Sequence, residues 1–276
     1  MIDVKIQKEM INISNVDIYC EHIFNEKPAI ILIHGFLSST YTFNKLIPLL
    51  AEHFSVLAID LPGFGRSEKS ATFRYSYSNY AHLVVKCMEH FSIQKAVLAG
   101  HSMGGQISLN IARLYPEKVK KLILLCSSGY LKKSKRFLVY CSYLPFFRYF
   151  AKRHVRKYDV KKELQNVLYD HKLITDEMVQ EFARPLSEND FYKSLIRLLR
   201  HREGDLSSEQ LKQIDVETLL IWGEEDRVVP FEIGKRLAKE LPNAKIISYR
   251  ETGHLITEER PKEIVNDILS FVSFRS

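Results

Sequence analysis

A serine between glycines marks the place where this chain can carry out nucleophilic chemistry. The run G-H-S-M-G, residues 100–104, follows a short apolar stretch over 96–99 and precedes apolar residues at helical spacing. A serine in so sharp a strand-to-helix turn has strained backbone dihedrals, and small neighbours let strand and helix approach. Its hydroxyl then projects clear of the sheet beside the first amides of the helix. The pattern predicts that Ser102 is a nucleophile.

A serine hydroxyl needs a base to take its proton and a third group to orient that base. His254 follows a predicted strand over 245–248, in E-T-G-H, and can act as the base. Asp226 follows an apolar run over 218–222, in G-E-E-D, and can orient the imidazole. Glu224 or Glu225 could supply the carboxylate instead, because carboxylates share this chemistry.

Alternating strand and helix patterns predict the elements that must position these residues. We expect strands over 29–33, 56–59, 96–99, 122–125, 218–222 and 245–248, with helices over about 43–53, 80–91 and 231–241 and a final helix near the C-terminus. The helix after Ser102 should stop near Tyr115, because Pro116 follows. Such alternation implies a parallel sheet with helices on both faces, and residues 5–13 and 17–24 read as an antiparallel hairpin at its edge. Ligands bind beyond the carboxyl ends of such strands, where Ser102, Asp226 and His254 lie.

The alternation stops after residue 128 and resumes near residue 214. The intervening segment is basic, aromatic and helical in pattern, without a convincing buried strand. We therefore predict an α/β core over 1–128 and 214–276, interrupted by a helical cap over 129–213.

Several motifs agree in order with a known family. They are H-G-F at 34–36, D-L-P-G-F-G-R-S at 60–67, G-H-S-M-G-G at 100–105, G-E-E-D at 223–226 and G-H at 253–254. With the chain order Ser, Asp, His, the sequence resembles an α/β-hydrolase-fold serine hydrolase with a helical cap, of the esterase and lipase kind, from about residue 28 to 274.

The resemblance implies a mostly parallel eight-stranded sheet and a set of site residues. Ser102 is the expected nucleophile, His254 the general base and then acid, and Asp226 the residue that holds the imidazole in its working tautomer. The backbone N–H groups of Phe36 and Met103 are the expected oxyanion hole.

The expected reaction is hydrolysis of an ester or thioester of a small to medium apolar acyl group through an acyl-enzyme, as in a carboxylesterase. Haloalkane dehalogenases and epoxide hydrolases would have Asp in place of Ser102. Carbon–carbon bond hydrolases of ring-fission products often have Asn and Trp where this chain has His101 and Leu255, which weakens that alternative without removing it. A perhydrolase, or a ligand sensor with slow or single turnover, also stays open. No cofactor and no metal is implied.

Three other features have structural interpretations. We expect the His101 side chain to point away from the site. The loop over 60–67 has a G-x-G shape but lacks the phosphate fingerprint and opens no helix, so nucleotide binding is not favoured and Arg66 is expected to form an ion pair. The four cysteines, at 20, 87, 126 and 141, lie far apart without metal-ligand spacing, as reduced thiols in a cytoplasmic protein would.

Composition fits an ordinary globular chain of 276 residues with a formal charge of +7. Nothing at the N-terminus resembles a signal peptide, and no apolar run approaches the ~20 residues of a membrane span. Residues 130–212 hold 18 lysines and arginines against 11 acidic residues, whereas the remainder is balanced, so the whole excess lies in the cap. No nucleic-acid motif accompanies it.

A dense aromatic stretch lies within the predicted cap. Between residues 137 and 150 it holds Phe137, Tyr140, Tyr143, Phe146, Phe147, Tyr149 and Phe150, with Lys132, Lys133, Lys135 and Arg136 before it and Lys152, Arg153, Arg156 and Lys157 after it. One interpretation packs the aromatic side on the core and leaves the basic side in water. The other is an interfacial lid, whose cations contact the anionic headgroups of a membrane. The oligomeric state has no signature in the sequence.

Overall fold

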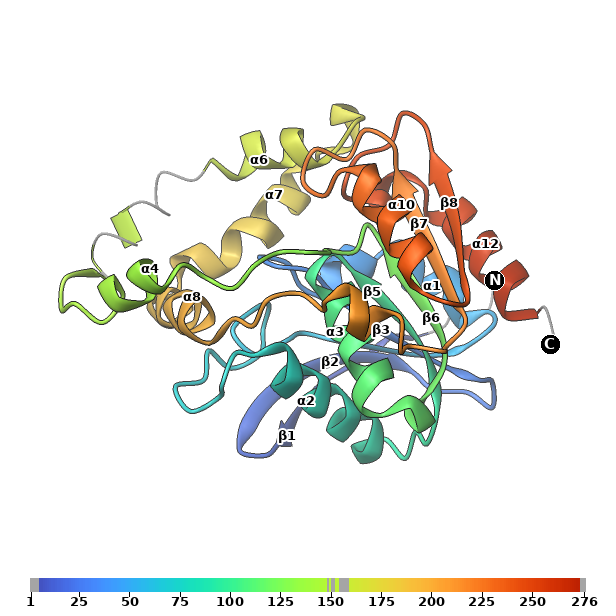
Figure 1. Cartoon of the computed structure of the whole chain (residues 1–276), viewed down its shortest axis with the longest axis horizontal. Coiled ribbons are helices and arrows are strands. Elements are labelled where there is room, and N and C mark those ends of the chain that lie inside the picture. The colour runs from blue at the N-terminus through green and yellow to red at the C-terminus, as the bar shows by residue number, and fades with distance from the viewer. Residues whose placement is uncertain (1–4, 148, 150–151, 154–158, 274–276) are drawn as a thin grey trace.

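Eight strands form one sheet in the computed structural model, which describes residues 5–147, 149, 152–153 and 159–273 (Figure 1). The strands are β1 Gln7–Ile13, β2 Val16–Ile23, β3 Ala29–Ile33, β4 Ser55–Ile59, β5 Ala96–His101, β6 Val119–Leu125, β7 Thr218–Gly223 and β8 Ala244–Tyr249. Their order across the sheet is β1-β2-β4-β3-β5-β6-β7-β8. β2 is antiparallel to both β1 and β4, and all other neighbours are parallel. The predicted edge hairpin and mostly parallel eight-stranded sheet are confirmed.

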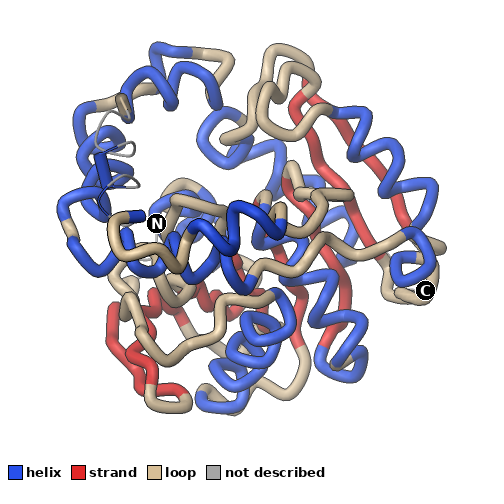
Figure 2. Tube along the Cα trace, turned by 60° about the vertical axis from the view of Figure 1, so that its left-hand side comes forward, coloured by secondary structure: helices blue, strands red, loops and turns tan. Residues whose placement is uncertain are grey.

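The central strands are buried along their whole length, which requires cover on both faces. The covering helices are α1 Leu46–Ala51, α2 Tyr77–His90, α3 Met103–Leu114, α10 Phe231–Glu240, α11 Ile256–Glu259 and α12 Pro261–Ser273. α1 packs against α12 and α2 packs against α3, while α10 contacts β7 and β8. In Figure 2, helices (blue) lie alongside the strands (red), except at the lower left of the view, where strands reach the edge of the molecule.

Two helix boundaries differ from the prediction for identifiable reasons. The helix expected over 43–53 is a 3-10 turn, Thr40–Phe43, followed by the shorter α1. Pro48 lies in the first turn of α1, where its missing N–H is tolerated, but it would interrupt a helix that began at residue 43. α2 starts before residue 80 because the Ser76 side chain caps it by accepting the Asn79 N–H. α3 ends at Leu114, as Pro116 predicts.

Helices also fill the chain between β6 and β7, here called the inserted segment. They are α4 Arg136–Cys141, α6 Val160–Val167, α7 Asp176–Ala183, α8 Asn189–His201 and α9 Ser208–Leu211, with 3-10 turns at His171–Leu173 and Arg184–Ser187. Figure 1 shows α4, α6, α7 and α8 grouped beside the sheet. Val160, Leu164, Leu168 and Met178 form a small hydrophobic cluster there with Leu255. The division of the chain at residues 129 and 213 stays a prediction, and Phe150, Arg156 and Lys157 lie outside the described residues.

None of the helices in the described ranges combines the length and the apolar character that a membrane span needs.

Candidate active site

Ser102 occupies a strained turn between β5 and α3. Its backbone has φ 53° and ψ −117°, a combination that L-residues rarely adopt. Small neighbours make this turn possible, since a Cβ on Gly104 would overlap the carbonyl oxygen of Ile33, and one on Gly100 would overlap that of Gly104. The Ser102 side chain does not cap α3. The turn therefore presents a partly exposed hydroxyl at the carboxyl end of the sheet.

Backbone donors lie close to this hydroxyl. Met103 is the first residue of α3, so its N–H has no acceptor within the helix. Phe36 follows Gly35, where an added Cβ would lie only 2.9 Å from the Cβ of Ser102. Within the described part of the chain, no hydrogen bond occupies the N–H of Phe36 or Met103. Both residues line the same pocket as Ser102, as two donors to an oxyanion would.

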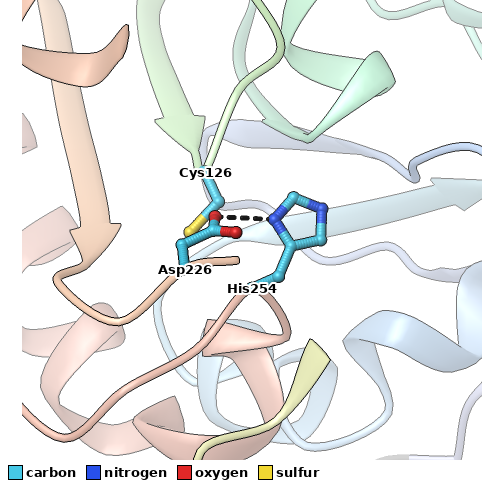
Figure 3. Close-up of side chains that lie close together, drawn as sticks. All are labelled: Cys126, Asp226 and His254. Carbon is cyan, nitrogen blue, oxygen red and sulfur yellow. Dashed lines mark hydrogen bonds and ion pairs between the residues drawn. The ribbon is translucent and has the colours of Figure 1, made fainter. Parts of the chain in front are cut away.

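His254 and Asp226 form a buried pair at the ends of neighbouring strands (Figure 3). Nδ1 of His254 lies 2.7 Å from Oδ2 of Asp226, and the side chains are 7% and 0% exposed. The other carboxylate oxygen, Oδ1, accepts the N–H groups of Val228 and Val229 at 2.8 Å each. These donors stabilise the ionised carboxylate, which in turn fixes the proton on Nδ1 and leaves Nε2 as the basic nitrogen.

The two alternative carboxylates are engaged elsewhere. Glu225 accepts the N–H of Thr252 at 3.0 Å, and Glu224 accepts the hydroxyl of Ser248 at 2.8 Å. Asp226 is therefore the carboxylate that contacts the imidazole.

Two apolar pockets meet at Ser102 and share Phe36 and Val228 on their walls. The Tyr77 pocket, of about 480 Å³, is lined by Tyr75, Tyr77, Tyr80 and Met103 and by Leu195, Leu198 and Leu199 of the inserted segment. The His254 pocket, of about 430 Å³, is lined by His254, His101 and Gly35 and by Leu164, Phe182 and Leu186 of the inserted segment. The inserted segment thus supplies a wall to each pocket.

The charged residues of the Tyr77 pocket, Arg202 and Glu203, contact neighbouring groups of the protein. Glu203 accepts the N–H and the hydroxyl of Ser78 at 3.1 and 3.0 Å, at the start of α2. Arg202 lies beside Tyr77 and the buried carboxyl of Asp205. The His254 pocket has one charged lining residue among those described, Glu163, and no lysine or arginine.

The sequence predicted that the His101 side chain points away from the site. This prediction is wrong, because the side chain contacts His254. Its Nε2 lies 2.9 Å from the backbone carbonyl oxygen of His254, and the two rings are 4.8 Å apart. Burial, reinforced by the neighbouring His254, lowers the pKa of His101 to about 3. The neutral ring therefore donates its Nε2 proton to the His254 carbonyl and supports the backbone of that loop.

Glu259 is a second residue that sequence reasoning missed. Its carboxylate accepts the N–H of Gly253 at 2.7 Å and those of Tyr169 and Asp170 at 2.9 and 3.0 Å. The N–H of His254 also donates to the carbonyl of Val167 at 2.7 Å. The loop that carries His254 is thus attached directly to the inserted segment. The only sequence signal for this role of Glu259 was the number of acidic residues in E-T-G-H-L-I-T-E-E, 251–259.

Cys126, Asp226 and His254 are also close enough to suggest a metal cluster, since their ligand atoms lie within 4.8 Å of one another (Figure 3). A metal requires the thiolate, whereas burial raises the pKa of the Cys126 thiol well above its usual range. Both oxygens of Asp226 already accept N–H donors. The three residues therefore do not fit a metal ion.

Arg66, as predicted, forms an ion pair, at 3.0 Å to Glu181 of α7.

The chain is similar to known proteins along most of its length. A family model described as the alpha/beta hydrolase fold matches residues 28–261. The chain is 48% identical over 261 residues to the uncharacterized hydrolase YugF of Bacillus subtilis (strain 168), covering 94% of this chain and 96% of that one. It is 30% identical over 239 residues to the 2-hydroxy-6-oxononadienedioate/2-hydroxy-6-oxononatrienedioate hydrolase of Comamonas testosteroni, covering 83% and 82%. A meta-cleavage product hydrolase from Pseudomonas fluorescens IP01 superposes with a TM-score of 0.79 at 24% identity, covering 95% and 96%, which speaks for the fold alone.

Proposed function

The chain belongs to the α/β-hydrolase family and is a hydrolase, and from its site we propose that it cleaves esters or thioesters of small to medium apolar acyl groups by serine catalysis. The observation that carries this proposal is the position of the strained Ser102. It lines two apolar pockets, and His254 of the His254–Asp226 pair lines one of them.

In the proposed mechanism, Nε2 of His254 takes the Ser102 proton as the hydroxyl oxygen attacks the substrate carbonyl. The N–H groups of Phe36 and Met103 stabilise the oxyanion, and Asp226 stabilises the imidazolium. His254 then protonates the leaving oxygen or sulfur, and the acyl group stays on Ser102. A water molecule, deprotonated by the same imidazole, releases the acid.

The positions of the pockets suggest which side of the substrate each one holds. His254 lines the His254 pocket but not the Tyr77 pocket, and it must reach the leaving atom to protonate it. We therefore assign the leaving alcohol or thiol to the His254 pocket. The acyl chain then occupies the Tyr77 pocket, whose aromatic and leucine side chains suit an apolar chain.

Carbon–carbon bond hydrolysis is the second candidate, because relatives at 30% identity are named for it. The dioate in one of those names carries carboxylates, and a buried carboxylate needs a cationic partner. The His254 pocket has Glu163 and no lysine or arginine among its described lining residues, so it favours a neutral substrate group. A ligand sensor with slow turnover remains a third candidate, although the intact His254–Asp226 pair favours an enzyme.

We place the protein in the cytoplasm as part of this proposal. All four cysteines are free, as expected where thiols stay reduced.

A fluorophosphonate probe followed by peptide mapping tests the nucleophile, and p-nitrophenyl esters of increasing acyl length test the reaction. We expect labelling at Ser102, repeated turnover of the esters, and loss of both in Ser102→Ala. A single slow turnover would support the sensor instead. Faster turnover of a ring-fission dienoate than of any ester would support the carbon–carbon hydrolase.

A further inference from the structure

The stretch of residues 132–146, here called the α4 patch, exposes large apolar side chains to solvent. Phe137, Tyr140 and Phe146 are 79%, 73% and 74% exposed, and Leu138, Tyr143 and Leu144 are exposed as well. α4 has no buried residue along its length. Figure 1 shows it at the end of the molecule away from α10 and α12. Soluble proteins rarely leave so many large apolar side chains together in water without a partner for them.

Lysines and arginines flank these side chains in the sequence. From residue 129 to residue 158 the sequence holds nine lysines and arginines and no aspartate or glutamate. Lys132, Lys133, Lys135 and Arg136 are exposed, and none of the ion pairs found among the described residues uses them. The patch therefore presents uncompensated cations beside apolar rings.

We propose that the α4 patch docks on an anionic lipid bilayer. A bilayer can contact both the apolar side chains and the cations of this patch. Aromatic and leucine side chains enter the boundary between headgroups and acyl chains, and lysine and arginine side chains contact the lipid phosphates. Phe137 and Tyr140 are three residues apart on α4 and so share a face of the helix, next to Arg136. A nucleic acid would use the cations but would leave exposed leucines such as Leu138 and Leu144 without a partner.

Docking would bring the bilayer next to the Tyr77 pocket. Leu131, which directly precedes the α4 patch, and Ser134, which belongs to it, both line that pocket. This step rests on the proposed hydrolase function, and it names the substrate class as esters dissolved in the bilayer. Their acyl chains would enter the Tyr77 pocket from the docked side.

Vesicle flotation with phosphatidylglycerol and phosphatidylcholine vesicles tests the docking. We expect at least tenfold tighter binding to phosphatidylglycerol vesicles at low salt, weakening as NaCl is added, because each lysine or arginine near an anionic surface contributes roughly fivefold. The double variant Lys132→Glu/Lys133→Glu and the double variant Phe137→Ser/Tyr140→Ser should each lower this binding at least tenfold.

Lys120→Glu/Lys262→Glu is the matched control, because it makes the same charge change at exposed lysines near the start of β6 and in α12. It should bind vesicles within twofold of the unmodified protein. Equal binding to both vesicle types, no binding to either, or an equal loss in the control would overturn the proposal. Binding of a short RNA duplex that survives in Phe137→Ser/Tyr140→Ser, with no vesicle binding, would point to a nucleic acid and also overturn it.

A second measurement separates docking from catalysis. Phe137→Ser/Tyr140→Ser should hydrolyse p-nitrophenyl acetate in buffer normally, which also shows that it folds, but should hydrolyse a long-chain ester in phosphatidylglycerol vesicles at least fivefold more slowly. Ser102→Ala should bind vesicles normally and hydrolyse neither ester. Normal vesicle binding by Phe137→Ser/Tyr140→Ser would refute the docking proposal and leave the hydrolase mechanism standing. Full ester hydrolysis by Ser102→Ala would refute the hydrolase mechanism and leave the docking proposal standing.

Discussion

Nε2 of His101 lies 2.9 Å from the backbone carbonyl oxygen of His254, across 153 residues of sequence. The residue that precedes the proposed nucleophile thus holds the backbone of the proposed base. Nδ1 of His101 is buried without a hydrogen-bond partner among the described residues, and the ring packs at 4.8 Å from the His254 ring. His101 therefore fixes the distance between the β5–α3 turn and the His254 loop.

This role predicts different outcomes for two substitutions of His101. His101→Gln can keep a donor near the carbonyl of His254 and should retain kcat within about threefold. His101→Leu removes the donor and should lower kcat roughly 10- to 100-fold with little change in KM, because a small misplacement of a catalytic group is costly. Steady-state kinetics on p-nitrophenyl butyrate would measure both. An equal loss in the two variants would show that the hydrogen bond does not matter.

The same residue predicts a dependence of stability on pH. His101 has a pKa of about 3 in the folded protein and an ordinary value near 6.5 when unfolded. Between these values the unfolded chain binds a proton that the folded chain excludes, so the free energy of unfolding falls as the pH falls below 6.5. The slope contributed by this one proton is about 1.4 kcal/mol per pH unit. Urea unfolding between pH 7 and pH 5 should therefore show a shallower loss for His101→Gln, and parallel curves would refute the prediction.

The sheet could be predicted from the sequence because its strands are short apolar runs that alternate with amphipathic helices. The central parallel strands are covered on both faces, and this burial leaves a continuous apolar pattern. Helix ends were less predictable, since they depend on single residues such as Pro48 and the capping hydroxyl of Ser76.

The contacts around the candidate site were harder to predict than the three residues proposed to form it. Ser102, Asp226 and His254 occur in local motifs, and each follows a strand. The contacts of His101 and Glu259 depend instead on how distant loops meet, and no local pattern encodes that. The exposure of the α4 patch is likewise a three-dimensional property, because an aromatic stretch in sequence fits burial against the core equally well.

Asp226 should be far more important for turnover than its acidic neighbour. Asp226→Asn removes the charge that stabilises the imidazolium and disturbs the tautomer of His254, so kcat should fall about 10³- to 10⁴-fold. Glu225→Gln is the matched control, since Glu225 bonds the Thr252 N–H and not the imidazole. Its kcat should stay within about tenfold. If Glu225→Gln were the more damaging change, the assignment of the carboxylate would be wrong.

The two pockets predict separate control of acyl and leaving-group preference. Leu198→Trp should fill part of the Tyr77 pocket and lower kcat/KM for octanoyl esters at least tenfold, while acetyl esters are unaffected. Leu186→Trp should fill part of the His254 pocket in the same way. It should lower kcat/KM for esters of bulky alcohols and leave that for esters of small alcohols unaffected. A matrix of acyl lengths against alcohol sizes would measure both. The opposite pattern would exchange the roles of the pockets.

Glu259 should couple the inserted segment to the His254 loop. Its carboxylate accepts the N–H groups of Gly253, Tyr169 and Asp170, and burial raises its pKa. Glu259→Gln keeps the shape but turns an NH₂ group toward N–H donors, which leaves at least one buried donor unpaired. Such a loss costs about 1–3 kcal/mol.

We therefore expect Glu259→Gln to lower the free energy of unfolding by that amount and to lower kcat, because the His254 loop loses an attachment. Glu263→Gln is the control, since Glu263 is a half-exposed residue of α12 that pairs with Arg260 at 3.8 Å. It should change the free energy of unfolding by less than about 0.5 kcal/mol. Hydrogen exchange at Gly253, Tyr169 and Asp170 would locate the effect. Unchanged exchange at these three amides in Glu259→Gln, even with lower stability, would show that the carboxylate does not join the two segments.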